Sequence, residues 1–115
     1  PVISSDGRTW RHLETVEYDA GEPKLRLKVT APGRRFWIAH VAPYTNKHLQ
    51  RLRERVSRRP GFQEEIIGKS VEGRNLLLWT LGNGPKTIWL MFRQHSWEAG
   101  SSWAGEGAIL ELAAN

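Results

Sequence analysis

Residues 87–100 read TIWLMFRQHSWEAG, and this stretch decides the fold that the sequence predicts. Its apolar run, residues 88–92, has no polar interruption, which is typical of a short strand buried on both faces. The chain then turns polar at Arg93, Gln94 and His95, and Glu98 follows three residues after the histidine. Ligands of open α/β sheets gather where such strands end and the chain enters the next helix. We therefore expect the functional residues at this strand end.

A helix is predicted before this stretch, directly after Pro43. Thr45 is a suitable N-cap, and residues 59–61, which read RPG, stop the helix. Three apolar residues fall on one face at helical spacing: Leu49, Leu52 and Val56. The pattern predicts an amphipathic helix with one buried side.

Two strands and a second helix complete the predicted α/β part of the chain. Residues 76–81 are apolar, and Asn83-Gly84 is a hairpin signal, so we expect that segment to pair with residues 87–92. Beyond Glu98, apolar residues recur at helical spacing, and two glycines among them would let this helix pack closely on a strand. These residues are Trp103, Gly105, Gly107, Ile109, Leu110 and Leu112.

The first 42 residues predict β structure. Short mixed segments and turn residues come first, and residues 25–29 (LRLKV) then alternate aliphatic and cationic side chains. This alternation is typical of a half-buried antiparallel strand. Residues 36–41 give another strand after the Pro32-Gly33 turn, so hairpins of a sandwich or meander are expected.

Composition sets broad limits on the class of protein. The 115 residues carry a net charge of +5 and 39% hydrophobic residues, which is ordinary for a globular protein. No apolar run approaches the roughly 20 residues that cross a bilayer, so no membrane partner is expected. The chain contains no cysteine, which fits a reducing compartment. Because it begins with Pro1 rather than Met, we expect a processed or excised piece of a longer protein.

The positive charge gathers on the predicted first helix. Five cationic residues lie on the side away from its apolar face: Lys47, Arg51, Arg53, Arg55 and Arg58. A solvated surface is the simpler interpretation, and a surface for nucleic acid or acidic protein is the alternative. No aromatic residue is interleaved with the cations, as base stacking would require, so nucleic acid is not the expected partner.

His95 and Glu98 carry the candidate chemistry. An imidazole and a carboxylate three residues apart, at a strand end and a helix start, can face one space and suit zinc as ligands. A carboxylate at a helix start beside a hydrogen-bonded histidine is an alternative that the spacing alone leaves open. A catalytic zinc needs about three protein ligands and an open position for water.

A longer pattern resembles a known family. Residues 67–76, IGKSVEGRNL, resemble a motif of the zinc carboxypeptidases related to carboxypeptidase A, and about twenty residues later the buried strand and H-x-x-E follow. Three further segments resemble the cytosolic carboxypeptidase branch more than the digestive one. They are Arg93-Gln94-His95, residues 42–45, and the β-rich beginning that contains residues 6–10. The resemblance spans nearly the whole chain.

The resemblance implies a fold and a function. It implies that residues 1–42 are the end of a β-sandwich domain and residues 43–115 the start of a doubly wound, mixed-sheet α/β catalytic domain. It implies zinc held by His95 and Glu98, and hydrolysis at the C-terminal tail of a peptide or protein, including acidic tails. A cytoplasmic location is expected, and nothing here predicts an oligomeric state.

Departures from the family pattern limit these expectations. Ser96-Trp97 stands where relatives of this branch have Pro-Gly, and the digestive relatives have arginine at the position of Trp97. The third zinc ligand, the general base and the carboxylate-binding residues are expected beyond residue 115, so the chain alone should be inactive. The other histidines, His12, His40 and His48, are not expected to replace the missing ligand, and Arg74 is expected to form a structural ion pair.

Overall fold

The computed structural model describes residues 1–114. The chain divides into two compact units, Pro1–Pro43 and Tyr44–Asn115. The first unit contains only strands. β1 (Val2–Ser4) lies between β2 (Arg11–His12) and β5 (Trp37–Ala39) in an antiparallel sheet. β3 (Thr15–Asp19) and β4 (Lys24–Lys28) form a separate antiparallel hairpin.

The core of this first unit lies at β1, whose three residues are all buried. The β1–β2 connection is held by side-chain acceptors: Ser4 Oγ accepts from the Gly7 amide at 2.8 Å, and Asp6 Oδ1 accepts from the Arg8 and Thr9 amides. The predicted strand at residues 25–29 is present as β4. Its expected half-burial is not, because Leu25 and Leu27 are both exposed.

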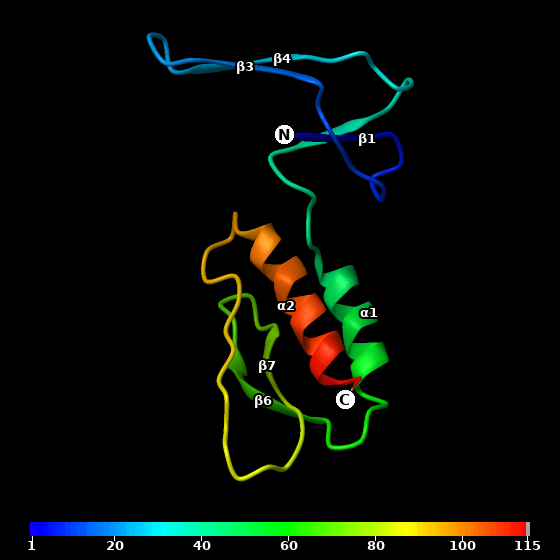
Figure 1. Cartoon of the computed structure of the whole chain (residues 1–115), viewed down its shortest axis with the longest axis vertical. Coiled ribbons are helices and arrows are strands. Elements are labelled where there is room, and N and C mark those ends of the chain that lie inside the picture. The colour runs from blue at the N-terminus through cyan, green and yellow to red at the C-terminus, as the bar shows by residue number, and fades with distance from the viewer. Residues whose placement is uncertain (115) are drawn as a thin grey trace. The chain divides into compact units, whose positions relative to one another are not determined.

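The second unit is α/β. It contains α1 (Asn46–Val56), β6 (Gln63–Lys69), β7 (Asn75–Thr80) and α2 (Ala99–Leu112). Both predicted helices are confirmed, and Figure 1 shows them side by side. Thr45 stands at the N-cap of α1, as predicted.

The buried face of α1 is narrower than its sequence predicts. Leu52 and Val56 are 4% and 1% exposed, but Leu49 is 40% exposed. The helix therefore buries its last two turns and leaves Leu49 at the edge of the packed face.

A polar cluster joins α1 to the β6–β7 hairpin. The guanidinium of Arg53 forms two hydrogen bonds with Glu64 of β6, one of them 2.6 Å long from Nε to Oε2. Trp79 Nε1 of β7 donates to the same Oε2 at 2.9 Å. The hydrogen bonds from Arg53 lower the pKa of Glu64. Burial opposes them in part, and the hydrogen bond from Trp79 and the charge of Arg53 lower it further, so the net shift is downward.

Replacement of Glu64 by glutamine should weaken the fold in a pH-dependent way. A carboxylate whose pKa is lower in the folded than in the unfolded chain stabilises the fold above its unfolded pKa, and this contribution is lost as pH falls through the folded value. The unfolding free energies of wild type and Glu64→Gln should therefore differ at pH 7 and converge as pH falls below the ordinary glutamate pKa of 4.5. Urea unfolding across this range measures it, with Glu65→Gln on the same strand as the control. A difference that is constant with pH would contradict the role of the charge.

The predicted buried strand at residues 88–92 is wrong for the described residues. Ile88 and Trp89 are 81% and 68% exposed, and the segment between β7 and α2, yellow to orange in Figure 1, contains no strand. The predicted hairpin at Asn83-Gly84 is wrong as well, because its second strand does not form and β7 pairs only with β6 among the described residues. An apolar run forms a strand only when its backbone groups pair with a neighbouring strand, and in residues 1–114 this run pairs with none.

The sheet of the second unit is a two-stranded antiparallel hairpin with a bulge between Ile66 and Gly68. It is a mixed helix and strand arrangement, and the doubly wound sheet stays a prediction. None of the helices in residues 1–114 combines the length and the apolar character that a bilayer crossing requires.

Candidate metal half-site

The two predicted ligands lie together. His95 Nδ1 and Glu98 Oε1 are 2.6 Å apart and share a hydrogen bond, and the His95 amide donates to Glu98 Oε2 at 3.3 Å. The Glu98 amide donates to the His95 carbonyl at 3.2 Å, which closes the loop between them. The two side chains therefore point toward each other, so that an imidazole nitrogen and a carboxylate oxygen, both possible metal ligands, lie side by side.

The start of α2 fixes this loop. Glu98 is the N-cap residue of α2, and the Ser101 hydroxyl in the first turn donates to the Glu98 carbonyl at 2.8 Å. On the other side of the loop, the Phe92 ring lies so close to Gly105 of α2 that a Cβ there would come within 2.8 Å of it. Gly105 thus permits the close packing predicted for this helix, although the packed residue is not in a strand.

Trp97 stands beside the half-site. Its ring is stacked on the His95 imidazole, with ring centroids 5.2 Å apart and an interplanar angle of 6°. The indole is 70% exposed, so it combines an aromatic contact to a candidate ligand with a face open to solvent. The bulky substitution in the family motif is therefore accommodated without displacing His95 from Glu98.

The donor set fits zinc as half of a site. Neutral imidazole nitrogen and carboxylate oxygen are both common zinc ligands, and His95 and Glu98 already face each other. A catalytic site needs about three protein ligands, however, and residues 1–114 contain no group of three His, Cys, Asp or Glu residues that could hold a metal. His95 and Glu98 are therefore a candidate half-site.

The other histidines lie elsewhere. His12 is in β2 of the first unit, and His40 follows β5. His48 is half-buried, because its ring contacts Tyr44 and Trp103 at centroid distances of 5.3 and 4.9 Å. Its Nδ1 accepts from the Thr45 amide at 3.0 Å. Burial, and then the charge of Arg51, lower the pKa of His48, which favours the neutral ring that this cap needs.

The motif at residues 67–76 forms the β6–β7 hairpin. Ser70 and Arg74 close its turn with a 2.8 Å backbone hydrogen bond, and Gly73 has a φ of +75° that favours glycine. Arg74 forms an ion pair with Glu72 in the same turn, which agrees with the structural role expected for it.

Arg93 is the residue that sequence reasoning missed. It has a φ of 55°, the left-handed region that a non-glycine residue rarely adopts. Its guanidinium donates to the Tyr44 carbonyl at 2.7 Å and to the Ser96 carbonyl, and its amide donates to Ser101 Oγ at 3.0 Å. No sequence signal predicts this role, because every bond goes to a backbone carbonyl or a serine.

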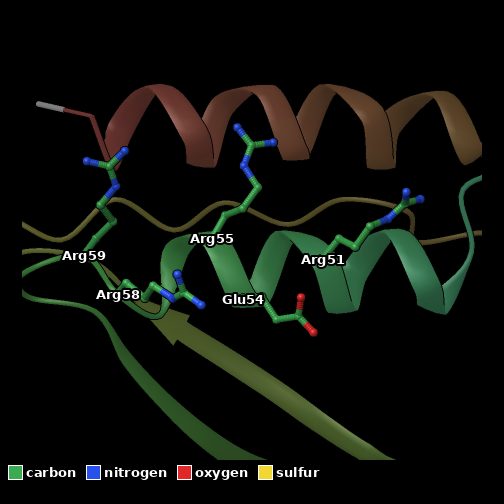
Figure 2. Close-up of a pocket in the computed structure, with 5 residues that line it drawn as sticks. All are labelled: Arg51, Glu54, Arg55, Arg58 and Arg59. Atoms are coloured by element: carbon green, nitrogen blue, oxygen red, sulfur yellow. The ribbon is translucent and has the colours of Figure 1, made fainter.

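A basic surface lies apart from these residues. An open cavity of about 500 Å³ at the end of α1 is lined by Arg51, Glu54, Arg55, Arg58 and Arg59. Figure 2 shows all five side chains projecting from α1 and the turn after it. The predicted basic face is present in part: Arg51, Arg55 and Arg58 lie on this surface with Glu54 and Arg59, and no aromatic side chain lines it. Arg53, also predicted for this face, instead bonds Glu64 of β6.

Comparisons with known proteins give related chains. No family model matches the sequence. An uncharacterized protein of Zymomonas mobilis is 32% identical over 110 residues, which cover 96% of this chain and 28% of that protein. A metallo-carboxypeptidase from Burkholderia cenocepacia has a TM-score of 0.87 and 27% identity, over 97% of this chain and 30% of that one.

A metallo-carboxypeptidase from Pseudomonas aeruginosa, solved in complex with (2-guanidinoethylmercapto)succinic acid, has a TM-score of 0.80 and 29% identity, over 96% of this chain and 30% of that one. The chain thus spans less than a third of the length of each of these proteins. Over most of its own length, it has a mixed α/β structure similar to that of metallo-carboxypeptidases.

Proposed function

We propose that this chain is part of a zinc metallocarboxypeptidase of the cytosolic carboxypeptidase branch, with His95 and Glu98 as two of its zinc ligands. One observation carries the proposal. An imidazole nitrogen and a carboxylate oxygen lie 2.6 Å apart at the start of α2, in a chain whose solved neighbours are metallo-carboxypeptidases. The substrate class that we propose is the C-terminal tail of a peptide or protein.

The proposal also assigns the parts of the chain. Residues 1–42 would end a β-sandwich domain and residues 43–115 would begin the catalytic domain. The third zinc ligand and the general base would come from residues outside this chain, so the chain alone would be inactive. The absence of cysteine supports a cytoplasmic location for the protein.

The chemistry of the half-site supports hydrolysis. When bound, zinc supplies polarisation of the scissile carbonyl and a water of lowered pKa. His95 and Glu98 would hold the zinc from one side. The hydrogen bonds from the His95 amide to the Glu98 carboxylate and from the Glu98 amide to the His95 carbonyl keep both side chains on that side. The exposed Trp97 indole beside His95 offers an apolar surface to a peptide at the same point.

The test is the release of single residues from a peptide terminus. The natural protein that carries this sequence should remove C-terminal residues from unblocked peptides, detected by mass spectrometry, and leave C-terminally amidated peptides intact. A chelator should stop the reaction, and added zinc should restore it. Cleavage within the peptide, or release that survives complete metal removal, would contradict the proposal.

The alternative is a binding module that uses the basic surface. Arg51, Arg55, Arg58 and Arg59 support it, because clustered guanidinium groups attract anionic polymers. Binding of a DNA duplex or of polyglutamate would fall steeply with salt and would not change in His95→Ala. The metal-dependent release described above would disappear in that same variant, which separates the two functions.

A further inference from the structure

We infer that Arg93 is the positioning residue of the candidate metal half-site, and this inference rests on the proposed function. Arg93 lies two residues before His95, and its contacts reach the loop between the two candidate ligands and the starts of both helices. Its guanidinium makes two of these contacts and its backbone amide the third.

The first contact fixes the loop from within. Arg93 Nη2 donates to the Ser96 carbonyl at 2.8 Å, and Nε donates to the same oxygen at 3.3 Å. Ser96 lies between His95 and Glu98, so this paired contact holds the backbone that sets their separation. A planar guanidinium can make such a two-nitrogen contact, whereas a lysine ammonium is a single compact donor group.

The second contact connects the loop to α1. Arg93 Nη1 donates to the carbonyl of Tyr44, which immediately precedes the N-cap of α1. Tyr44 is itself buried at 7% exposure, and its ring packs edge-on against Trp103 of α2 at 4.9 Å. Burial, and then its hydrogen bond with Glu106 of α2, raise the pKa of the Tyr44 hydroxyl. The guanidinium is therefore attached to a carbonyl that has little freedom to move.

The third contact connects the backbone of Arg93 to α2. The Arg93 amide donates to Ser101 Oγ at 3.0 Å, and that hydroxyl donates to the Glu98 carbonyl at 2.8 Å. One hydroxyl thus links the residue before the loop to the ligand after it. This geometry requires the left-handed backbone at Arg93, with its φ of 55°, which persists only where the surroundings determine it.

These contacts have a consequence for metal binding. Some residues orient the metal ligands through hydrogen bonds without binding the metal. Mutation of such a residue commonly lowers the metal affinity by about 10–100-fold. Arg93 would do this for the ligand loop, since its guanidinium bonds the Ser96 carbonyl inside the loop and the Tyr44 carbonyl before α1.

Zinc affinity tests the inference, measured by competition with a chromophoric chelator on the natural protein. Arg93→Ala should bind zinc about 10–100-fold more weakly than wild type, and Arg93→Lys should recover only part of the loss. Arg93→Gly should lose as much as Arg93→Ala, because it relieves the left-handed backbone but removes the same hydrogen bonds. Arg55→Ala, an arginine of the basic surface on α1, is the matched control and should bind zinc as wild type does.

Two further readouts separate positioning from stability. The visible spectrum of the cobalt-substituted protein should change in Arg93→Ala, and amide exchange at His95 and Glu98 should accelerate in the metal-free variant. A folded Arg93→Ala protein with wild-type zinc affinity, cobalt spectrum and amide exchange would overturn the inference while leaving the proposed function in place. Wild-type protein whose zinc affinity does not depend on His95 would instead overturn the proposed function.

Discussion

His95→Ala and Glu98→Ala should each abolish stoichiometric zinc binding while the protein keeps its fold. Each change removes one of the two candidate ligand atoms, His95 Nδ1 and Glu98 Oε1, which lie 2.6 Å apart. Because the loss of a residue that only orients a ligand costs about 10–100-fold in affinity, the loss of a ligand should cost more than about 100-fold. Metal content after dialysis against a weak chelator measures this, and circular dichroism checks the fold.

Matched controls are available in the same chain. His12→Ala removes a histidine from β2 in the first unit, and Glu65→Gln removes an exposed carboxylate from β6. Both should leave the zinc content of the protein at its wild-type value. Zinc retained in His95→Ala but lost in His12→Ala would move the metal site to the other unit and refute the assignment.

Leu52→Ala should be the most destabilising single change on α1. The Leu52 side chain is 4% exposed, so its truncation removes buried apolar atoms and leaves a cavity. Such a change costs about 2–5 kcal/mol of unfolding free energy. Leu49→Ala is the control, because it makes the same substitution on the same helix at a residue that is 40% exposed.

Chemical unfolding of both variants gives the comparison. The cost of Leu49→Ala should be less than half that of Leu52→Ala, since much of its side chain is already in water. Equal costs would show that the apolar stripe predicted from the sequence, with all three residues buried, describes the packed helix better than the structure does.

The helices were predictable because their signals are local. Three local signals identify α1 without any knowledge of its neighbours. They are Thr45 at the N-cap, the stop at residues 59–61, and the helical spacing of Leu52 and Val56. The start of α2 likewise follows directly after Glu98. Caps, breakers and helical periodicity act within a few residues, so they survive in any tertiary context.

The strand at residues 88–92 failed because strand formation is not local. The apolar run has the composition of a buried strand, but in the described residues its expected partner β7 pairs only with β6, across the tight turn at Ser70–Arg74. The β6–β7 hairpin forms across a turn with Gly73 at positive φ, whereas the second edge of β7 pairs with none of the described residues. A strand pattern identifies a segment that can pair, but it does not show whether pairing occurs.

The closeness of His95 and Glu98 was predictable, and the contacts that support them were not. The H-x-x-E spacing and the family resemblance together singled out these residues, which do lie together, and their role as zinc ligands stays a prediction. Arg93 has a left-handed backbone and donates to backbone carbonyls, and such contacts leave no pattern of residue types in the sequence. Trp97 could be recognised in the sequence as a departure from the family motif, but its stacking on His95 could not be predicted from the motif.

Diffraction data from the zinc-loaded natural protein, collected on both sides of the zinc absorption edge, test the central claim most directly. We predict one anomalous peak between His95 Nδ1 and the Glu98 carboxylate, in place of the hydrogen bond that now joins them. A peak elsewhere in the protein, or an intact His95–Glu98 hydrogen bond in the zinc-loaded crystals, would contradict the assignment of these residues as zinc ligands.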